Sequence, residues 1–256
     1  MAVNLRRDNM SGHSKWSTIK HKKAKTDAQK GKIYTKMAKL IAVAAREGGA
    51  DPDLNAKLKD AIAKAKSNNM PNDNIERAIK KGAGELGNSV FEEITYEGYG
   101  IGGVAVIVEA LTDNKNRTAG DVRYYFDKNG GNLGTSGCVS FMFEKKGTIL
   151  VDNDGNVDEE ELMMIALDSG AEDFDVSDDG FEITTTPETF SKVCDALEEN
   201  VIKTASASVE MVPSNYTKLE DEAQIKKFEK MLEMFEDNDD VQDVYHNAEF
   251  PDDYEG

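Results

Sequence analysis

The chain has 256 residues, of which 39% are hydrophobic and 31% are charged, and its formal net charge is −18. No apolar run reaches the roughly 18 residues that a membrane-spanning helix needs. The two cysteines, Cys138 and Cys194, are too few and too far apart for a disulfide scaffold or a metal knuckle, and they fit a reducing cytosol. A chain of this length predicts two or three domains.

Apolar residues at helical spacing predict three helices in the first third of the chain. The first covers residues 33–46 and ends at Gly48-Gly49, with Lys32, Lys36 and Lys39 exposed beside its apolar face. The second begins at Asp51-Pro52, an N-cap followed by proline, and the third opens at Met70-Pro71. The predicted core faces contain Ile33, Met37, Leu40, Ile41, Ala44, Leu54, Leu58, Ala61, Ile62, Ala65, Ile75, Ala78 and Ile79.

From residue 91 the pattern changes to strands mixed with helices. Strands are predicted at 91–97 and 104–111 around a glycine turn, in a hairpin of 138–143 with 148–151, and at 173–176, 181–185, 205–212 and 241–245. Helices are predicted at 114–129, 159–167, 187–199 and 219–235. This order predicts an α+β protein in which a three-helix bundle precedes two ferredoxin-like α/β domains.

The predicted domains follow this change of pattern. Residues 10–88 form the basic helical domain, residues 89–135 and 205–246 form the second domain, and residues 136–204 form a third domain inserted into the second. We expect flexible ends at residues 1–9 and 247–256, with the first nine residues an extension ahead of Met10.

Charge is distributed very unevenly along the chain. Residues 1–89 carry 19 Lys and Arg against 9 Asp and Glu, whereas the remaining residues carry 12 against 40. Residues 14–46 hold ten cations and a single acid, Asp27. Because crowded like charges repel each other, such a segment indicates a polyanionic partner, and a phosphate backbone is the commonest one. A solvated basic face that merely offsets acids elsewhere is the alternative.

The basic segment has further features of a nucleic-acid contact. Its lysines form two groups, at 20–25 and 30–36, and Trp16 and Tyr34 lie among them where they can stack on bases. Gly31 lets backbone amides approach an anion. Tyr34 fits the core of the bundle equally well.

Other motifs give weaker signals. Residues 98–103 match GxGxxG, but a strand follows them instead of the helix that a dinucleotide site requires, so they predict a hairpin turn. Residues 152–156 resemble the start of a calcium loop, yet Val157 and Met163 occupy the positions of its glycine and bidentate acid, which favours a solvated acidic turn. None of the three histidines belongs to a nucleophile motif. We therefore expect no catalysis, cofactor or metal; a buried carboxylate with a raised pKa in a pocket would favour an enzyme instead.

Long motifs in the chain resemble the YebC/PmpR family, which is related to the mitochondrial translational activator of cytochrome c oxidase. They are GHSKWSTIKHKKAKTDAQKGKIYTK, AAREGGADPDLNAKLKDAIAKAKSNNMPNDNIERAIKKG, YEGYGIGGVAVIVEALTDNKNRTAGDVRYYF and KNGGNLGTSGCVSFMFEKKG. Departures from the usual letters include Lys30 for arginine, which keeps the charge and loses the bidentate fork, Ala38-Lys39, Ile101 for proline and Cys138 for serine.

The resemblance implies three domains, the third inserted into the second, and a cytoplasmic protein. Many members are described as DNA-binding transcriptional regulators, and others resemble translation factors that act on ribosomes stalled at proline-rich stretches. By motif, the candidate nucleic-acid contacts are Lys15, Trp16, Lys20, His21, Lys22, Lys23, Lys25, Lys30, Lys32 and Lys36.

Together, these observations predict a non-enzymatic regulator of gene expression that binds DNA or ribosomal RNA through its basic segment. The excess of lysine over Arg, Asn and Gln favours recognition of the backbone rather than of base edges. The acidic domains should face away from nucleic acid or meet the ribosome or another basic protein surface.

Overall fold

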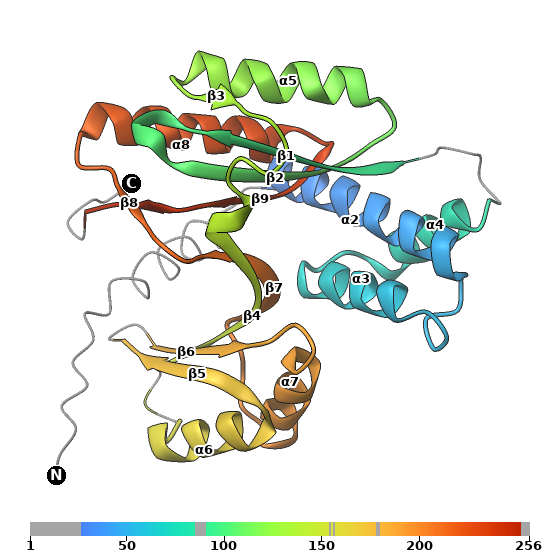
Figure 1. Cartoon of the computed structure of the whole chain (residues 1–256). Helices are drawn as coiled ribbons and strands as arrows, with labels where there is room; N and C mark the ends of the chain where they lie inside the picture. Colours follow the sequence, from blue (N-terminus) through green and yellow to red (C-terminus); the bar gives the residue numbers. More distant parts are fainter. Residues whose placement is uncertain (1–26, 85–90, 154, 156, 178–179, 252–256) are drawn as a thin grey trace, which may run out of the picture. The chain divides into compact units, whose positions relative to one another are not determined.

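The computed structural model describes residues 27–84, 91–153, 155, 157–177 and 180–251. Among the described residues, the contacts divide the chain into two compact units, one with residues 27–140 together with 219–248, the other with 141–218 and the residues from 249 on. In the first unit lie α2 (Asp27–Gly48), α3 (Ala56–Ser67), α4 (Asn72–Gly82), β1 (Glu92–Tyr99), η1 (Ile101–Gly103), β2 (Ala105–Thr112), α5 (Lys115–Lys128), β3 (Asn132–Leu133), α8 (Glu222–Asp237) and β9 (Val241–His246). The elements from residue 141 to 218 are β4 (Phe143–Asp152), α6 (Glu159–Ser169), β5 (Ala171–Val176), β6 (Gly180–Thr185), α7 (Phe190–Glu199), β7 (Ser206–Pro213) and β8 (Thr217–Lys218) (Figure 1). Two short elements, η2 (Ser140–Met142) and β10 (Ala248–Glu249), include the residues at which the sequence passes from one unit to the other.

The predicted three-helix bundle is present as α2, α3 and α4. Its core contains Met37, Ile41, Leu58, Ala65 and Ile75, all on the faces that the spacing predicted. Gly82, the last residue of α4, lies where an added Cβ would come within 2.3 Å of the carbonyl oxygen of Ala42. A residue without a side chain is therefore required for α4 to pack closely on α2.

The start of the second bundle helix differs from the prediction. Asp51-Pro52 belongs to a turn, and α3 begins after Asn55, whose side chain accepts a hydrogen bond from Leu58 N and donates to the carbonyls of Ala44 and Gly49. Leu54, predicted to lie in the core, is 84% exposed because it precedes the helix. Asn55 is buried and satisfies three backbone groups, an advantage that an exposed Asp51 cap lacks.

The sheet of the first unit is antiparallel, with strand order β3-β1-β2-β9. Figure 1 shows α5 and α8 over the same side of this sheet, where Phe126 and Phe235 pack edge to face at 5.3 Å. The GxGxxG stretch spans the end of β1, Gly100 and η1, and β2 begins two residues later, so a strand does follow it, as predicted. Gly100 permits Phe228 to approach, since a Cβ there would lie 2.9 Å from its ring.

Glu97 on β1 holds the loop that leaves this sheet. Its carboxylate is buried and accepts backbone N–H bonds from Gly137 at 2.8 Å, Val139 at 2.9 Å and Ser140 at 2.8 Å. Burial by itself would raise the pKa of Glu97, but the backbone donors outweigh it and lower the pKa below its ordinary value. This stretch was predicted to start a hairpin; its amides are instead paired with a side chain.

Glu97→Gln is therefore expected to lower the free energy of unfolding by about 1.5–3 kcal/mol. The charged acceptor is lost, and the NH2 group of the glutamine side chain faces a backbone N–H that needs an acceptor. Urea unfolding followed by circular dichroism at pH 7 measures this loss. Because the folded pKa of Glu97 is lowered, its contribution is present above pH 4.5 and declines as the pH falls below it. Glu93→Gln, at an exposed position of the same strand, is the control; equal effects of the two changes would contradict the assignment.

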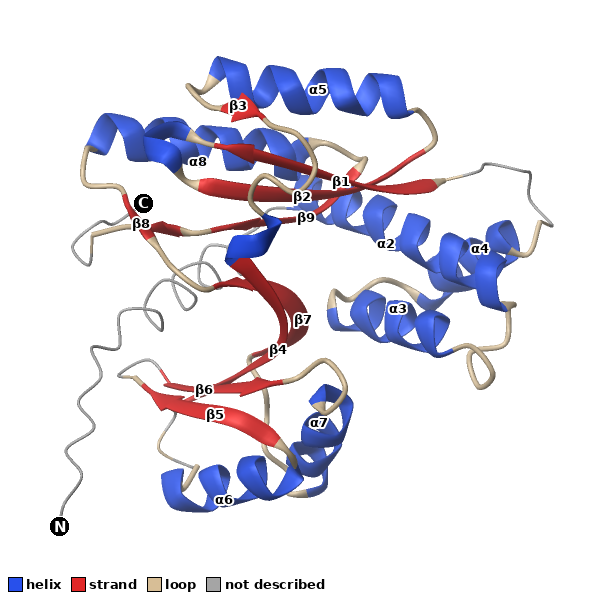
Figure 2. Cartoon of the chain, viewed as in Figure 1, coloured by secondary structure: helices blue, strands red, loops and turns tan. Residues whose placement is uncertain are grey.

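The unit of residues 141–218 has a ferredoxin-like topology. Its elements follow the order βαββαβ, and the antiparallel sheet has strand order β5-β6-β4-β7 (Figure 2). The core on the helix-bearing face comprises Ile149, Val151, Leu162, Ala166, Phe181, Ile183, Val193 and Leu197. The sheet of the first unit has a different strand order, so only one of the two sheet domains follows the ferredoxin-like scheme.

Two details of this unit correct the sequence analysis. The predicted hairpin of 138–143 with 148–151 is wrong, because β4 runs unbroken through Gly147 and pairs with β6 on one side and β7 on the other. The predicted boundary of the inserted domain is residue 204. However, β7 pairs with β4, so the compact unit extends to residue 218. Elsewhere α7 begins at Phe190, three residues after the predicted Pro187.

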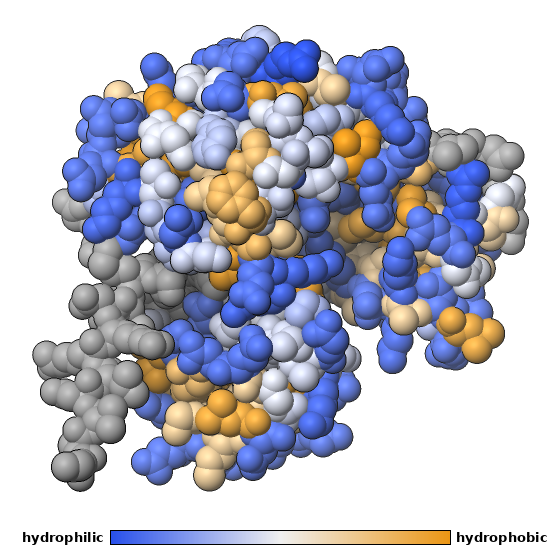
Figure 3. Space-filling model, in the orientation of Figure 1, coloured by the Kyte–Doolittle hydropathy of each residue, from blue (hydrophilic) through white to orange (hydrophobic). Residues whose placement is uncertain are grey.

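The α+β class is confirmed, and the surface matches the polar composition. Hydrophilic side chains dominate the face drawn in Figure 3, with apolar ones in separate small groups. Within the described ranges, no helix has the length and apolar character needed to cross a bilayer.

Candidate nucleic-acid interface

Three of the ten residues predicted to contact nucleic acid can be placed in the fold. Lys30, Lys32 and Lys36 lie in the first half of α2. Lys30 is exposed, as a phosphate contact requires. Outside the described residues lie Lys15, Trp16, Lys20, His21, Lys22, Lys23 and Lys25.

Lys32 and Lys36 contact the protein's own acidic segment, residues 236–243. Lys32 Nζ lies 2.7 Å from Asp237 Oδ1, and Lys36 Nζ donates to the carbonyl oxygen of Glu236 at 2.8 Å. The prediction that Lys32, Lys36 and Lys39 are exposed is wrong, because Lys36 is buried and the other two are half-buried. The assignment of Lys32 and Lys36 as nucleic-acid contacts stays a prediction.

Asp240 is the centre of the acidic segment. Its side chain is only 6% exposed; Lys39 Nζ lies 2.7 Å from Oδ1, and Arg117 Nη2 lies 2.6 Å from Oδ2. Thr112 and Thr118 also donate hydroxyl hydrogen bonds to Oδ2, at 3.1 and 2.9 Å. Burial alone would raise the pKa of Asp240, yet the hydrogen bonds from Lys39, Arg117 and Thr118 prevail and hold the pKa at about 2.

A further lysine extends this contact along the bundle. Lys64 of α3 lies 3.1 Å from Asp243 Oδ2, so cations of two helices contact the acidic segment. These partners were not predicted from the sequence, since acids are abundant and no local spacing links residues about 200 positions apart. These lysines therefore hold the bundle against α8 and β9, a structural role that accounts for part of the basic character.

Four other bundle cations have no such role. Lys59 and Lys66 of α3 and Arg77 and Lys80 of α4 are exposed and form no ion pair within the described part of the chain. Lys59 and Lys66 are seven residues apart, so they share one face of α3, and Arg77 and Lys80 are neighbours on α4. These four residues were not predicted as nucleic-acid contacts, and their spacing along the two helices was the available signal.

Two residues that supported the prediction of a nucleic-acid contact, Tyr34 and Gly31, have structural roles in the helical bundle. Tyr34 is partly buried against the bundle core, and its hydroxyl donates to the carbonyl of Asn69 at 2.7 Å, so of its two predicted roles the core one applies. Gly31 lies inside α2, where its N–H belongs to the helical hydrogen-bond ladder rather than to an anion site.

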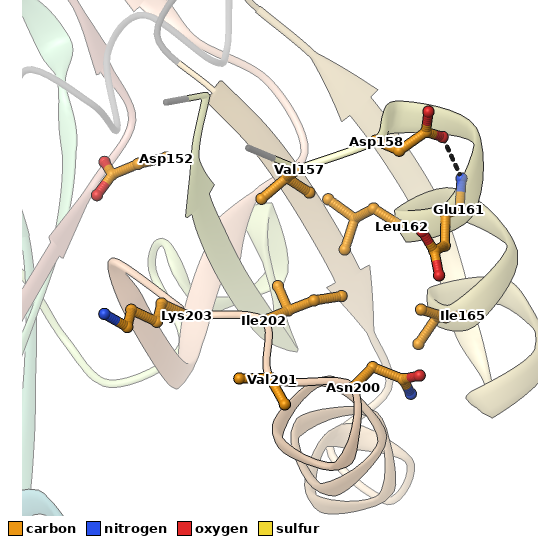
Figure 4. Close-up of a pocket in the computed structure, with 10 residues that line it drawn as sticks. All are labelled: Asp152, Val157, Asp158, Glu161, Leu162, Ile165, Asn200, Val201, Ile202 and Lys203. Atoms are coloured by element: carbon orange, nitrogen blue, oxygen red, sulfur yellow. Dashed lines mark hydrogen bonds between the residues drawn. The ribbon is translucent and has the colours of Figure 1, made fainter. Parts of the chain in front are cut away.

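A hollow of about 390 Å³ lies in the other unit, between the end of β4, α6 and the segment after α7. In Figure 4 the aliphatic side chains of Val157, Leu162 and Ile202 approach one another across it. Its carboxylates, Asp152, Asp158 and Glu161, are all exposed, whereas a catalytic acid with a raised pKa requires burial. Among the described residues that line it there is no His, Cys or Ser.

Metal and thiol chemistry have little basis among the described residues. Within them, no group of three or more His, Cys, Asp or Glu could hold an ion. Two positions of the calcium-like stretch, Asp154 and Asn156, fall outside the described ranges. Both cysteines are free thiols, and burial raises the pKa of Cys194 to about 11, which leaves that thiol unreactive.

Two family profiles cover most of this architecture. The profile of the TACO1/YebC protein N-terminal domain matches residues 14–85, and that of the TACO1/YebC second and third domain matches residues 91–248. The chain belongs to the TACO1/YebC family. The boundary between the two TACO1/YebC profiles falls between α4 and β1, where the charge changes sign.

Relatives of this TACO1/YebC protein match over nearly their whole length. A protein of Hathewaya histolytica is 59% identical over 96% of this chain and 100% of its own, and one of Clostridioides difficile is 63% identical over 90% and 97%. Both are named probable transcriptional regulatory proteins, so the description at the level of the family is a regulator of transcription. The crystal structure of a conserved hypothetical protein from Aquifex aeolicus, 48% identical, superposes with a TM-score of 0.79 over 89% of this chain and 93% of that one.

Proposed function

We propose that this protein is a non-enzymatic, DNA-binding transcriptional regulator that contacts phosphates through its basic N-terminal segment. One observation carries the proposal: residues 15–30 contain six lysines and one acid in a chain of net charge −18. Lys32, Lys36 and Lys39 of α2 are bonded to the acidic segment, which explains their positive charge without nucleic acid. The dense group at residues 20–25 therefore becomes the main phosphate contact.

The exposed cations of α3 and α4 are further candidates for phosphate contact. Lys59, Lys66, Arg77 and Lys80 belong to the same compact unit as α2 and are not neutralised by described acids. Positive charge on the bundle attracts a polyanion over a distance of about 10 Å at ordinary salt. We propose that these residues make additional, weaker phosphate contacts.

Ribosomal RNA is the second candidate partner, and one feature favours it. Lysines outnumber Arg, Asn and Gln in residues 14–46, so few side chains there pair bidentately with base edges. Backbone and shape recognition of this kind suits structured RNA as well as duplex DNA. Crosslinking in cells followed by sequencing separates the two: promoter fragments support the transcription role, and ribosomal RNA supports a translation factor acting at stalled ribosomes.

Absence of catalysis and a cytoplasmic location are parts of the same proposal. The carboxylates of the hollow beside α6 are exposed, and its lining holds no nucleophile motif, which supports a binding protein over an enzyme. Two free thiols fit a reducing compartment, where nucleic acid and ribosomes are found.

The affinity for DNA is expected to depend steeply on salt. About seven phosphate contacts give a slope of log K against log salt near −6, so that affinity falls by about three to four decades between roughly 50 and 200 mM salt. Fluorescence anisotropy of a labelled 20-base-pair duplex across that range measures the slope. A slope near zero would show that the basic segment is not the binding surface.

A further inference from the structure

Helix α6 presents an unusual apolar face to solvent. Its inner side buries Leu162 and Ala166 against the sheet, whereas Met163, Met164 and Leu167 are 37%, 60% and 47% exposed. Leu167 is four residues from Met163 and three from Met164, so it adjoins both methionines on the helix surface and the three side chains form one patch. Figure 3 shows apolar side chains gathered among hydrophilic ones where Figure 1 places α6.

Negative charge surrounds this patch. The helix has Glu159, Glu160 and Glu161 in its first turn and Asp168 near its end, and it contains no Lys or Arg. The helix dipole stabilises the three glutamates at the N-terminus but opposes an acid at the C-terminus. Asp168 forms no ion pair with a described residue, so its charge does not stabilise the fold.

The chemistry of the face defines its occupant. Acids around the patch repel nucleic acid and attract cations, and methionine side chains adapt to the irregular surface of an apolar partner. The eleven-residue α6 is about 16 Å long, which matches about three turns of a second helix. We propose that the outer face of α6 binds a basic amphipathic helix of a partner protein.

The proposed contact has two separable parts. Met164 and Leu167 supply apolar burial, worth roughly 1.5–3 kcal/mol for each fully buried side chain. Glu160 and Asp168 supply attraction to lysines or arginines at the rim. The surface does not depend on the nucleic-acid-binding segment, which lies in a different part of the sequence.

A labelled 18-residue helical peptide with a leucine stripe and a lysine-rich polar face serves as the probe, measured by anisotropy with the full-length protein. Met164→Gln with Leu167→Gln is expected to weaken binding about tenfold or more, and Glu160→Gln with Asp168→Asn several-fold. Glutamine keeps helix propensity at exposed positions, and a thermal melt verifies folding. Asp195→Asn with Glu199→Gln removes the same charge from exposed positions of α7 and is expected to change affinity less than about twofold.

A photo-crosslinking residue at position 164 tests the surface in cells, with one at exposed Leu54 as the control. The expected crosslink maps by mass spectrometry to a Lys- and Arg-rich helix of another protein and disappears with Leu167→Gln. Crosslinks to nucleic acid, to a second copy of this chain, or no more than at position 54 would overturn the proposal. Equal peptide binding by the Met164→Gln, Leu167→Gln variant and the α7 control would do so as well.

Discussion

Replacing Lys20, Lys22, Lys23 and Lys25 by glutamine is expected to reduce the affinity for nucleic acid by about three decades at 0.1 M salt. Each phosphate contact contributes about 0.9 to the slope of log K against log salt, so losing four of about seven contacts also reduces that slope from near −6 to near −3. Anisotropy titrations at several salt concentrations, with duplex DNA and with purified ribosomes, measure both quantities.

The control variant must distinguish the loss of these particular lysines from the change in net charge of the protein. Lys192, Lys203, Lys227 and Lys230 are exposed cations outside the bundle, and their replacement by glutamine lowers the net charge by the same amount. None of these four lysines belongs to the proposed phosphate-contacting segment, so this variant should lose less than about threefold in affinity. Undiminished binding by the first variant, or equal losses in both, would contradict the assignment. Lys32 and Lys36 are unsuitable for this test because they bind the acidic segment.

Local patterns in the sequence predicted the elements whose signals are local. The 3.6-residue spacing of Met37 and Ile41 predicted α2, Asn114 and Asn129 bounded α5, and the glycine turn between two apolar runs predicted the antiparallel pairing of β1 with β2. Where two local signals competed, the prediction was wrong: Asp51-Pro52 is a good N-cap signature, but Asn55 satisfies more backbone groups once α2 is packed beside it.

Tertiary partners were not predictable in the same way. Nothing near Lys36 or Lys39 in the sequence distinguishes a lysine that meets phosphate from one that meets residues 236–240, since both are lysines beside an apolar helix face. The predicted hairpin of 138–143 with 148–151 left Gly147 between its strands, yet Gly147 lies within β4 and allows Thr185 and Phe190 to approach that strand, a requirement that only the folded sheet reveals. The charge asymmetry predicted a basic module. Which of its cations are bonded to the protein's own acids, and which are available to a ligand, depends on the tertiary structure.

The Asp240→Asn substitution is expected to lower the free energy of unfolding by about 2–3 kcal/mol at pH 7. It leaves Lys39, whose side chain is only 15% exposed, without its carboxylate. Arg117 is half exposed, so water compensates part of its loss and keeps the effect in the lower part of the usual range. Urea unfolding followed by far-UV circular dichroism measures the difference.

The pH dependence follows from the pKa of Asp240, which is about 2 in the folded protein against an ordinary value of 3.8. A lowered folded pKa means that the carboxylate stabilises the fold above about pH 4, and that this contribution is lost as the pH falls toward 2. The difference between wild type and Asp240→Asn should therefore narrow over that interval, by about 2 kcal/mol.

Asp237→Asn provides a control matched in chemistry and distance. Asp237 also lies 2.7 Å from a lysine of α2, but its side chain is 65% exposed and that of Lys32 is 42% exposed. An exposed pair of this kind contributes about 0–1 kcal/mol, so burial rather than ion pairing as such should separate the two variants. Equal destabilisation by the two substitutions would mean that Asp240 does not anchor the bundle. If the expected difference is found, the acidic segment anchors α2 through the contact of Asp240 with Lys39.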